Sequence, residues 1–169
     1  MIRDLINTNT EVMDVREDPV KGIVVGGLSE IHVTSSADVM ETIRLSNRNR
    51  TTEPTKLNET SSRSHAVLII TVCHRNREEN TMQETILQGK LSLIDLAGSE
   101  RASVTQNKGL RLIEGANINR SLLALANCIN ALCDIQKGIS KVHIPYRDSK
   151  LTRILKDSLG GNCSTVMIA

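Results

Sequence analysis

The chain has 169 residues, of which 39% are hydrophobic, and 21 Lys and Arg residues nearly balance 19 Asp and Glu residues. This composition is typical of one globular domain with a core. The net charge of +2 and the near absence of aromatic residues, one Tyr and no Phe or Trp, argue against nucleic acid as a partner. No apolar run approaches the roughly 20 residues of a membrane span, so neither a membrane partner nor export is expected.

The cysteines indicate an intracellular, reducing environment. The four are Cys73, Cys128, Cys133 and Cys163. They form no C-x-x-C pair and accompany no His cluster, so the sequence predicts neither a zinc site nor a disulfide framework. We expect reduced thiols in the cytosol.

The first third of the chain predicts a hairpin and a helix. Residues 11–33 read as extended structure, with two apolar runs on either side of Gly26-Gly27, a turn signal of β-hairpins. Capping residues at 35–38 precede a periodic segment with an Arg-rich end. We expect a short helix there, closed before Pro54.

Two apolar runs in the middle of the chain predict strands. Residues 66–72 and 91–94 are rich in β-branched and aliphatic residues, with a polar connection between them. We expect both strands to be buried on at least one side.

The last third predicts helices and a strand. Apolar residues recur at spacings of four and three over about five helical turns, at Ile118, Leu122, Leu125, Ile129 and Leu132. Residues 147–159 place leucines and basic residues on nearly opposite faces of another helix, which Gly160-Gly161 stops. Residues 165–168 begin a further strand. The alternation predicts an α/β fold, a central sheet flanked by helices.

Two polar segments adjoin the predicted strands. Residues 58–65 read N-E-T-S-S-R-S-H and precede the first strand, whereas residues 95–100 read D-L-A-G-S-E and follow the second. A carboxylate at a strand end can hold Mg²⁺ through its water shell, and a glycine three residues later lets a backbone N–H approach a terminal phosphate. Hydroxyls of Ser61 and Ser62 can complete an oxygen shell. The two segments therefore predict a phosphate-dependent switch.

Each feature also has an ordinary interpretation. A D-x-x-G sequence is a common turn, and a Ser-rich loop is usually a solvated connection. Arg63 can form a surface ion pair worth about 0–1 kcal/mol. A histidine at the start of an apolar strand, such as His65, is commonly structural.

Four segments taken together resemble the motor domain of kinesins. They are similar to the first switch, the second switch, the start of the relay helix and the second microtubule-facing segment. In that order they are residues 58–65, 95–100, 114–122 (E-G-A-N-I-N-R-S-L) and 143–153 (H-I-P-Y-R-D-S-K-L-T-R). The resemblance implies one domain over residues 1–169, a partial motor domain of the phosphate-loop NTPase type. The wording of residues 91–103 and 121–132 most resembles the kinesin-eight class, whose members move along microtubules and regulate their ends.

The resemblance implies ATP and Mg²⁺ as cofactors, and roles for the first switch. Asn58 and Ser61 would position the phosphate and the attacking water, and Ser62 would coordinate Mg²⁺. Arg63 would pair with Glu100 of the second switch.

The resemblance also implies roles after the second strand. Asp95 would lie in the second shell of the metal, and the Gly98 backbone would sense the γ-phosphate. Asn119, at the head of the relay helix, would contact the closed switch. Hydrolysis then needs an aligned water and stabilised charge rather than a covalent nucleophile.

Basic residues concentrate towards the end of the chain. Residues 137–158 hold six basic and two acidic side chains, an excess that attracts an acidic partner, although such a face is often only solvated. The resemblance identifies the partner as tubulin, in the microtubule cytoskeleton of the cytoplasm. The candidate microtubule-binding residues are Lys137, Lys141, Arg147, Lys150 and Arg153.

The sequence contains no phosphate loop of the form G-x-x-x-x-G-K-[ST]; its one Gly-Lys pair, Gly89-Lys90, is followed by Leu91. The chain therefore resembles the second half of a motor domain without its N-terminal strands, and we expect it to be inactive alone and to expose apolar strand faces. Two interpretations stay open. In the first, the chain is part of an ATP-hydrolysing microtubule motor. In the second, it is a microtubule-binding module without nucleotide turnover. The motifs predict no oligomeric state, direction of movement, depolymerase activity or cargo.

Overall fold

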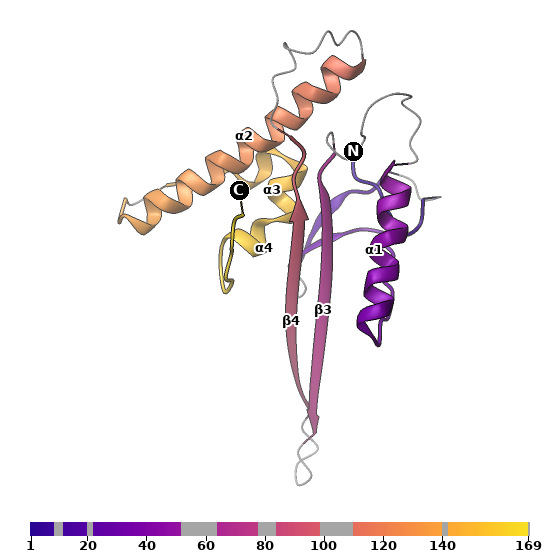
Figure 1. Cartoon of the computed structure of the whole chain (residues 1–169). Helices are drawn as coiled ribbons and strands as arrows, with labels where there is room; N and C mark the ends of the chain where they lie inside the picture. The colour runs from indigo at the N-terminus through magenta and orange to yellow at the C-terminus, as the bar shows by residue number, and fades with distance from the viewer. Residues whose placement is uncertain are drawn as a thin grey trace.

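The structure, a computed structural model, describes residues 1–8, 12–19, 22–51, 64–77, 84–98, 110–139 and 142–168. The elements in chain order are β1 (Val15–Asp18), β2 (Gly22–Val25), α1 (Ser36–Thr51), β3 (Ala66–Arg77), β4 (Glu84–Asp95), α2 (Leu110–Gln136), a 3-10 turn (Tyr146–Asp148), α3 (Lys150–Ile154) and α4 (Lys156–Leu159). The long β3–β4 ribbon separates α1 on one side from α3 and α4 on the other (Figure 1). Within the described ranges the strands form two separate two-stranded sheets, β1–β2 and β3–β4.

The predicted hairpin is present, but its turn is not where the sequence indicated. β1 and β2 pair antiparallel from Val15 opposite Val25 to Asp18 opposite Gly22, so the chain reverses between Asp18 and Gly22. Gly22 has a φ of 72°, a conformation that glycine adopts without steric cost. The chain does turn at Gly26-Gly27, where the Leu28 amide donates to the Val25 carbonyl at 3.5 Å. The prediction that this turn joins the two strands is wrong, because it lies after β2.

Helix α1 confirms the predicted helix and owes its start to a reciprocal cap. The Ser35 hydroxyl accepts a hydrogen bond from the Asp38 amide at 3.2 Å, and the Asp38 carboxylate accepts one from the Ser35 amide at 2.9 Å. This arrangement satisfies two backbone donors that a helix start leaves without partners. The helix then continues to Thr51, before Pro54 as predicted.

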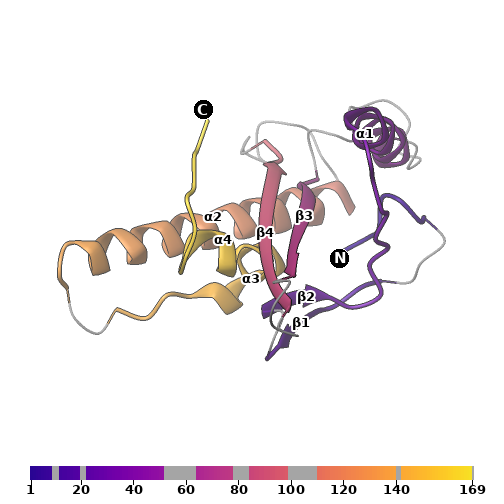
Figure 2. The ribbon, with the colours of Figure 1, turned by 90° about the horizontal axis from the view of Figure 1, so that it is seen from below.

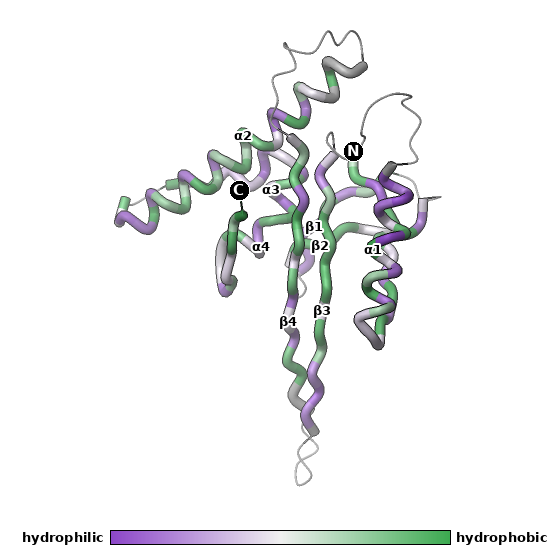
Figure 3. Tube along the Cα trace, viewed as in Figure 1, coloured by the Kyte–Doolittle hydropathy of each residue, from purple (hydrophilic) through white to green (hydrophobic). Residues whose placement is uncertain are grey.

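The ribbon of β3 and β4 confirms both predicted strands and extends them to 12 residues each. Their register runs from Ala66 opposite Asp95 to Arg77 opposite Glu84. Burial of these strands was expected on at least one side, and for much of the ribbon that expectation is wrong, since Val72 and Leu87 are each 62% exposed. Apolar stretches along both strands are visible in Figure 3. In the described part of the chain no third strand pairs with the ribbon, which agrees with the expectation that apolar strand faces are exposed.

Helix α2 contains the predicted apolar repeat and is longer than five turns. It has 27 residues, which corresponds to about 40 Å, and Figure 1 and Figure 2 show it crossing the ribbon at the end where β4 finishes. None of the described helices is both long and apolar enough to span a membrane. The inward face of α2 forms the core with α3 and α4. The core residues are Leu125, Leu151 and Leu155, with Ile129, Ile154 and Leu159 packed against them.

Cys128 also lies on the inward side of α2 and is fully buried. All four cysteines are free thiols, and the other three are exposed.

The helix predicted over residues 147–159 is broken into the 3-10 turn, α3 and α4. Ser149 adopts an extended conformation and caps α3, because its hydroxyl accepts from the Thr152 amide at 3.0 Å while its own amide donates to the Thr152 hydroxyl at 3.2 Å. A residue that caps one helix cannot continue another. The leucine spacing survives the break, so Leu151 and Leu155 still reach the core.

The strand predicted at residues 165–168 is wrong. This segment carries no strand assignment, and Val166 and Ile168 are 82% and 93% exposed. An extended apolar segment becomes a strand only when a neighbouring strand accepts its hydrogen bonds.

We expect Gly22→Ala to lower the free energy of unfolding by about 1–3 kcal/mol. Alanine at this position would have to keep the left-handed backbone conformation, and its Cβ would lie 2.7 Å from the Asp157 Oδ2. That oxygen accepts a hydrogen bond from the Ile23 amide at 3.1 Å. Urea denaturation followed by circular dichroism measures the change. Gly26→Ala is the matched control, because its nearest neighbour would be the Arg16 Nε at 3.5 Å. Equal stability of the two variants would contradict this explanation.

Candidate functional site

The antiparallel register brings the two predicted switch segments to one end of the ribbon. Ala66 lies opposite Asp95, so the chain before β3 and the chain after β4 leave the sheet side by side. Of the predicted switch and relay residues, the structure describes Asp95, Gly98 and Asn119. Of the predicted microtubule-binding residues, it describes Lys137, Arg147, Lys150 and Arg153. Outside the described residues lie Asn58, Ser61, Ser62, Arg63, Glu100 and Lys141. The Arg63–Glu100 ion pair therefore stays a prediction.

Arg50 connects three elements at this end of the ribbon. It lies in the last turn of α1, and its side chain is 7% exposed. The guanidinium donates from Nη1 to the Asp95 Oδ2 at 2.6 Å, from Nε to the Ser64 Oγ at 3.2 Å and from Nη2 to the Ser64 carbonyl at 2.5 Å. A planar guanidinium can serve several acceptors at once. Sequence reasoning missed Arg50, since a basic residue at a helix end usually indicates only a favourable interaction with the helix dipole.

The Arg50–Asp95 pair is asymmetric in its exposure to solvent. The arginine is buried, whereas the Asp95 side chain is 69% exposed. One carboxylate oxygen of Asp95 is therefore held in place while the group stays accessible. No group of three or more His, Cys, Asp or Glu within the described ranges is arranged to hold a metal. A single oriented carboxylate fits a Mg²⁺ that is held through water, which is the position predicted for Asp95.

His65 joins the same end of the ribbon to helix α2. Its Nδ1 accepts a hydrogen bond from the Ala97 amide at 3.0 Å, and its Nε2 lies 2.7 Å from the Ser121 Oγ. The Ala97 amide can only donate, so Nδ1 carries no proton and Nε2 carries the one proton of the neutral ring. Nε2 then donates to Ser121, whose hydroxyl donates to the Ile118 carbonyl at 2.7 Å.

The surroundings of His65 favour its neutral form. Burial lowers the pKa of the imidazole, the charge of Arg50 lowers that pKa further, and the charge of Asp95 opposes the change. The neutral ring is the form that can accept from the Ala97 amide. Electrostatics and hydrogen bonding thus both favour a neutral His65 ring.

Comparison with known proteins identifies the family. The family model described as "Kinesin motor domain" matches residues 1–169. The chain belongs to the kinesin motor-domain family. It is 59% identical over its whole length to the human kinesin-like protein KIF19, 57% identical over 99% of its length to KIP3 of Saccharomyces cerevisiae and 54% identical over its whole length to KIN-8B of Arabidopsis thaliana. These matches agree with the resemblance to the kinesin-eight class.

Solved kinesin structures share the fold. A KIF14 chain whose structure is described as "ADP in complex with a microtubule" matches with a TM-score of 0.83 and 40% identity, over 96% of this chain and 47% of that one. A second KIF14 structure, a dimer described as "AMP-PNP in complex with a microtubule", gives a TM-score of 0.82 and 40% identity, over 95% of this chain and 46% of that one. The kinesin chain spans 16%, 21% and 20% of KIF19, KIP3 and KIN-8B, respectively.

Two further predicted site residues of this kinesin are described. Gly98 is exposed and ends the described segment that contains β4. Asn119 is half-buried within α2, which begins at Leu110, so the expectation that Asn119 stands at the head of the helix is wrong. The helix extends further towards the N-terminus than the motif indicated. The contact of Asn119 with a closed switch stays a prediction.

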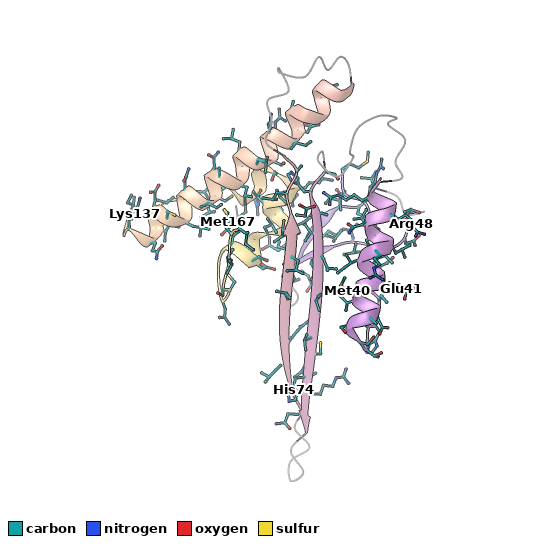
Figure 4. The ribbon with its side chains drawn as sticks, viewed as in Figure 1. Met40, Glu41, Arg48, His74, Lys137 and Met167 are labelled. Atoms are coloured by element: carbon teal, nitrogen blue, oxygen red, sulfur yellow. The ribbon has the colours of Figure 1, made fainter. Side chains whose placement is uncertain are left out.

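The basic residues of this kinesin divide into two places. Lys137 immediately follows α2, at the end of the helix that is remote from β4 (Figure 4). Lys150 contacts the Asp14 Oδ1 at 2.7 Å and Lys156 contacts the Glu17 Oε1 at 2.5 Å. These contacts tie α3 to the residue before β1 and α4 to β1 itself. Arg147 is exposed and Arg153 is half-buried.

We expect Arg50→Lys to lower the free energy of unfolding by about 1–3 kcal/mol. An ammonium group cannot reproduce the three-acceptor contact of the guanidinium, so an oxygen of the half-buried Ser64 or of Asp95 loses its partner. Urea denaturation measures the change. Arg44→Lys is the control, because Arg44 is exposed on the same helix, and it should change stability by less than about 0.5 kcal/mol. A loss no larger than that of the control would argue against the junction.

We expect acid to destabilise the native protein partly through His65. The pKa of His65 in the folded chain lies below that in the unfolded chain, so below about pH 6.5 the unfolded state binds the proton more readily. The contribution is complete above that pH and is lost as the pH falls. Urea denaturation at pH 7.5 and pH 5.5 should show a smaller pH effect for His65→Gln than for the natural sequence. The same pH effect in both proteins would refute this assignment.

Proposed function

We propose that this chain supplies the nucleotide-switch and microtubule-binding parts of a kinesin motor that couples ATP hydrolysis to movement along microtubules in the cytoplasm. The observation that carries the proposal is the junction at the ends of β3 and β4, where Arg50 and His65 connect both switch positions to α1 and α2. The KIF14 structures similar to this chain are described with ADP or AMP-PNP and with a microtubule.

In the proposed reaction the residues of this chain position groups around the phosphate. Mg²⁺, when bound with ATP, neutralises charge that develops on the phosphate oxygens. Ser62 would hold the metal and Asp95 would orient its water, which suits the exposed, Arg50-bound carboxylate. The Gly98 amide would contact the terminal phosphate.

The remaining switch residues would align the reaction and close the site. Asn58 and Ser61 would orient the attacking water, and an Arg63–Glu100 ion pair would hold the switches together. The sequence contains no phosphate loop, and in this class of enzyme that loop cradles the phosphates. We infer that these 169 residues do not turn over ATP by themselves.

The proposed microtubule-binding surface combines α3 and α4 with β1. The contact with Lys150 lowers the pKa of Asp14, and the contact with Lys156 lowers the pKa of Glu17. The positive charges of Arg16, Arg147 and Arg153 act on the same two carboxyl groups. The same elements also carry Asp18, Asp148 and Asp157, so positive and negative groups balance in number. The attraction for an acidic surface such as that of tubulin is assigned to Arg147 and Arg153, which are not the partners in the two ion pairs.

A microtubule-binding module without turnover is the second candidate. The charged cluster lies on the 3-10 turn, α3 and α4, on β1 and on Asp14 just before it, and its ion pairs require no nucleotide. Microtubule binding that is indifferent to nucleotide would favour the module. Nucleotide-dependent binding would favour the motor.

We expect Arg147→Ala combined with Arg153→Ala to weaken cosedimentation with microtubules roughly tenfold and to reduce its salt dependence. These arginines add to the positive field without being the direct partners of Asp14 and Glu17 in the Lys150 and Lys156 ion pairs. Sedimentation at several salt concentrations gives the apparent Kd.

The matched control is Arg44→Ala combined with Arg75→Ala. It removes the same charge from exposed positions on α1 and β3. An equal loss of binding in both double variants would mean that only net charge matters, and the α3–α4 surface would be dismissed.

A further inference from the structure

We propose that His65 is a positioning residue that couples the backbone after β4 to helix α2 through Ser121. The inference deepens the proposed function, since it assigns the contact by which a change at the phosphate-sensing backbone reaches the relay helix.

The first argument is the position of the Ala97 amide. Ala97 is 4% exposed, so its N–H needs a partner within the protein. That partner is the His65 Nδ1 at 3.0 Å. Ala97 immediately precedes Gly98, whose backbone is proposed to contact the terminal phosphate. A movement of the Gly98 backbone therefore changes the distance between the Ala97 amide and the imidazole.

The second argument is the direction of the hydrogen bonds. Because Nδ1 accepts from Ala97, Nε2 must donate to Ser121, and the Ser121 hydroxyl is left to donate to the Ile118 carbonyl. Both ring nitrogens are thus committed, and successive hydrogen bonds of one direction strengthen one another. The ring cannot follow the Ala97 amide and keep Ser121 unless the strand end and the helix move together.

The third argument is the place of Ser121. It is half-buried in α2, the helix whose other end bears Lys137 and whose inward face packs on α3 through Leu125 and Leu151. A displacement of α2 at Ser121 is therefore passed to the element that carries Lys150 and Arg153. Rigid elements in contact can transmit such a displacement when a joining contact has two states, formed and broken.

The first test uses the 169-residue chain and reads the imidazole directly. Nitrogen-15 NMR of His65 should give the signature of a neutral ring protonated on Nε2, and Ser121→Ala should broaden or shift the Nε2 resonance. Ser121→Thr keeps a hydroxyl and should restore the natural signature. A ring protonated on Nδ1 would overturn the proposal.

The second test asks whether the contact transmits. Hydrogen exchange of the Ala97 amide, followed by mass spectrometry of peptides that span it, should be about fivefold faster in Ser121→Ala than in the natural chain. Saturating microtubules should change this exchange by about fivefold or more in the natural chain and in Ser121→Thr, but not in Ser121→Ala. The control is Ser46→Ala, a half-buried serine on α1, which should behave as the natural chain.

The outcomes separate this inference from the proposed function. If Ser121→Ala and Ser46→Ala respond alike to microtubules, His65 has only a structural role and the inference is wrong. If the natural chain does not bind microtubules, the proposed function fails. In that case the ring signature and the effect of Ser121→Ala on Ala97 exchange still decide whether His65 joins the two elements.

Discussion

The antiparallel pairing of β3 with β4 is the constraint on which the site depends. Twelve residue pairs fix Ala66 opposite Asp95, so two segments about 30 residues apart in sequence leave the ribbon at one point. A shift of one residue would turn the side chains to opposite faces and would separate Asp95 from the Ser64 and His65 positions. Arg50 and His65 can join the ribbon to α1 and α2 only because the register holds.

The two junction residues use different chemistry for related purposes. Arg50 is a buried cation that meets one exposed carboxylate and two oxygens of Ser64, so it fixes the strand ends to α1 with charge. His65 is neutral and fixes them to α2 with two directional hydrogen bonds. Charge holds over a range of geometries, whereas a hydrogen bond weakens steeply when its angle changes. The α1 side is therefore the firm support and the α2 side is the sensitive one.

The sequence predicted elements whose signals are local and missed features whose causes are distant. The Ser35 cap and the α2 repeat are both local, and both helices were found. The break at Ser149 was hidden because the leucine spacing continues through it. Gly26-Gly27 does form a turn, but the strands of the hairpin are joined before Gly22. Residues 165–168 have the composition of a strand, but a strand needs a partner that the segment itself cannot indicate.

The candidate site divides in the same way. Asp95 could be predicted from the D-x-x-G pattern at a strand end, but its partner Arg50 lies 45 residues away. The partner of His65 in α2 lies 56 residues away, and the ordinary interpretation of a histidine at a strand start gave no reason to connect them. The motifs could therefore indicate which residues take part in the chemistry, but not the contacts that orient the Asp95 and His65 side chains.

The complete burial of Cys128 makes its thiol a natural probe of the core. Three cysteines are open to solvent, whereas Cys128 is 0% exposed, and burial raises the pKa of its thiol, with a smaller contribution from Asp148. Reagents therefore reach this thiol through a local opening that separates α2 from the 3-10 turn and α3. Cys128 should therefore be alkylated most slowly of the four cysteines, and its alkylation rate reports how often this interface opens, with no engineered label.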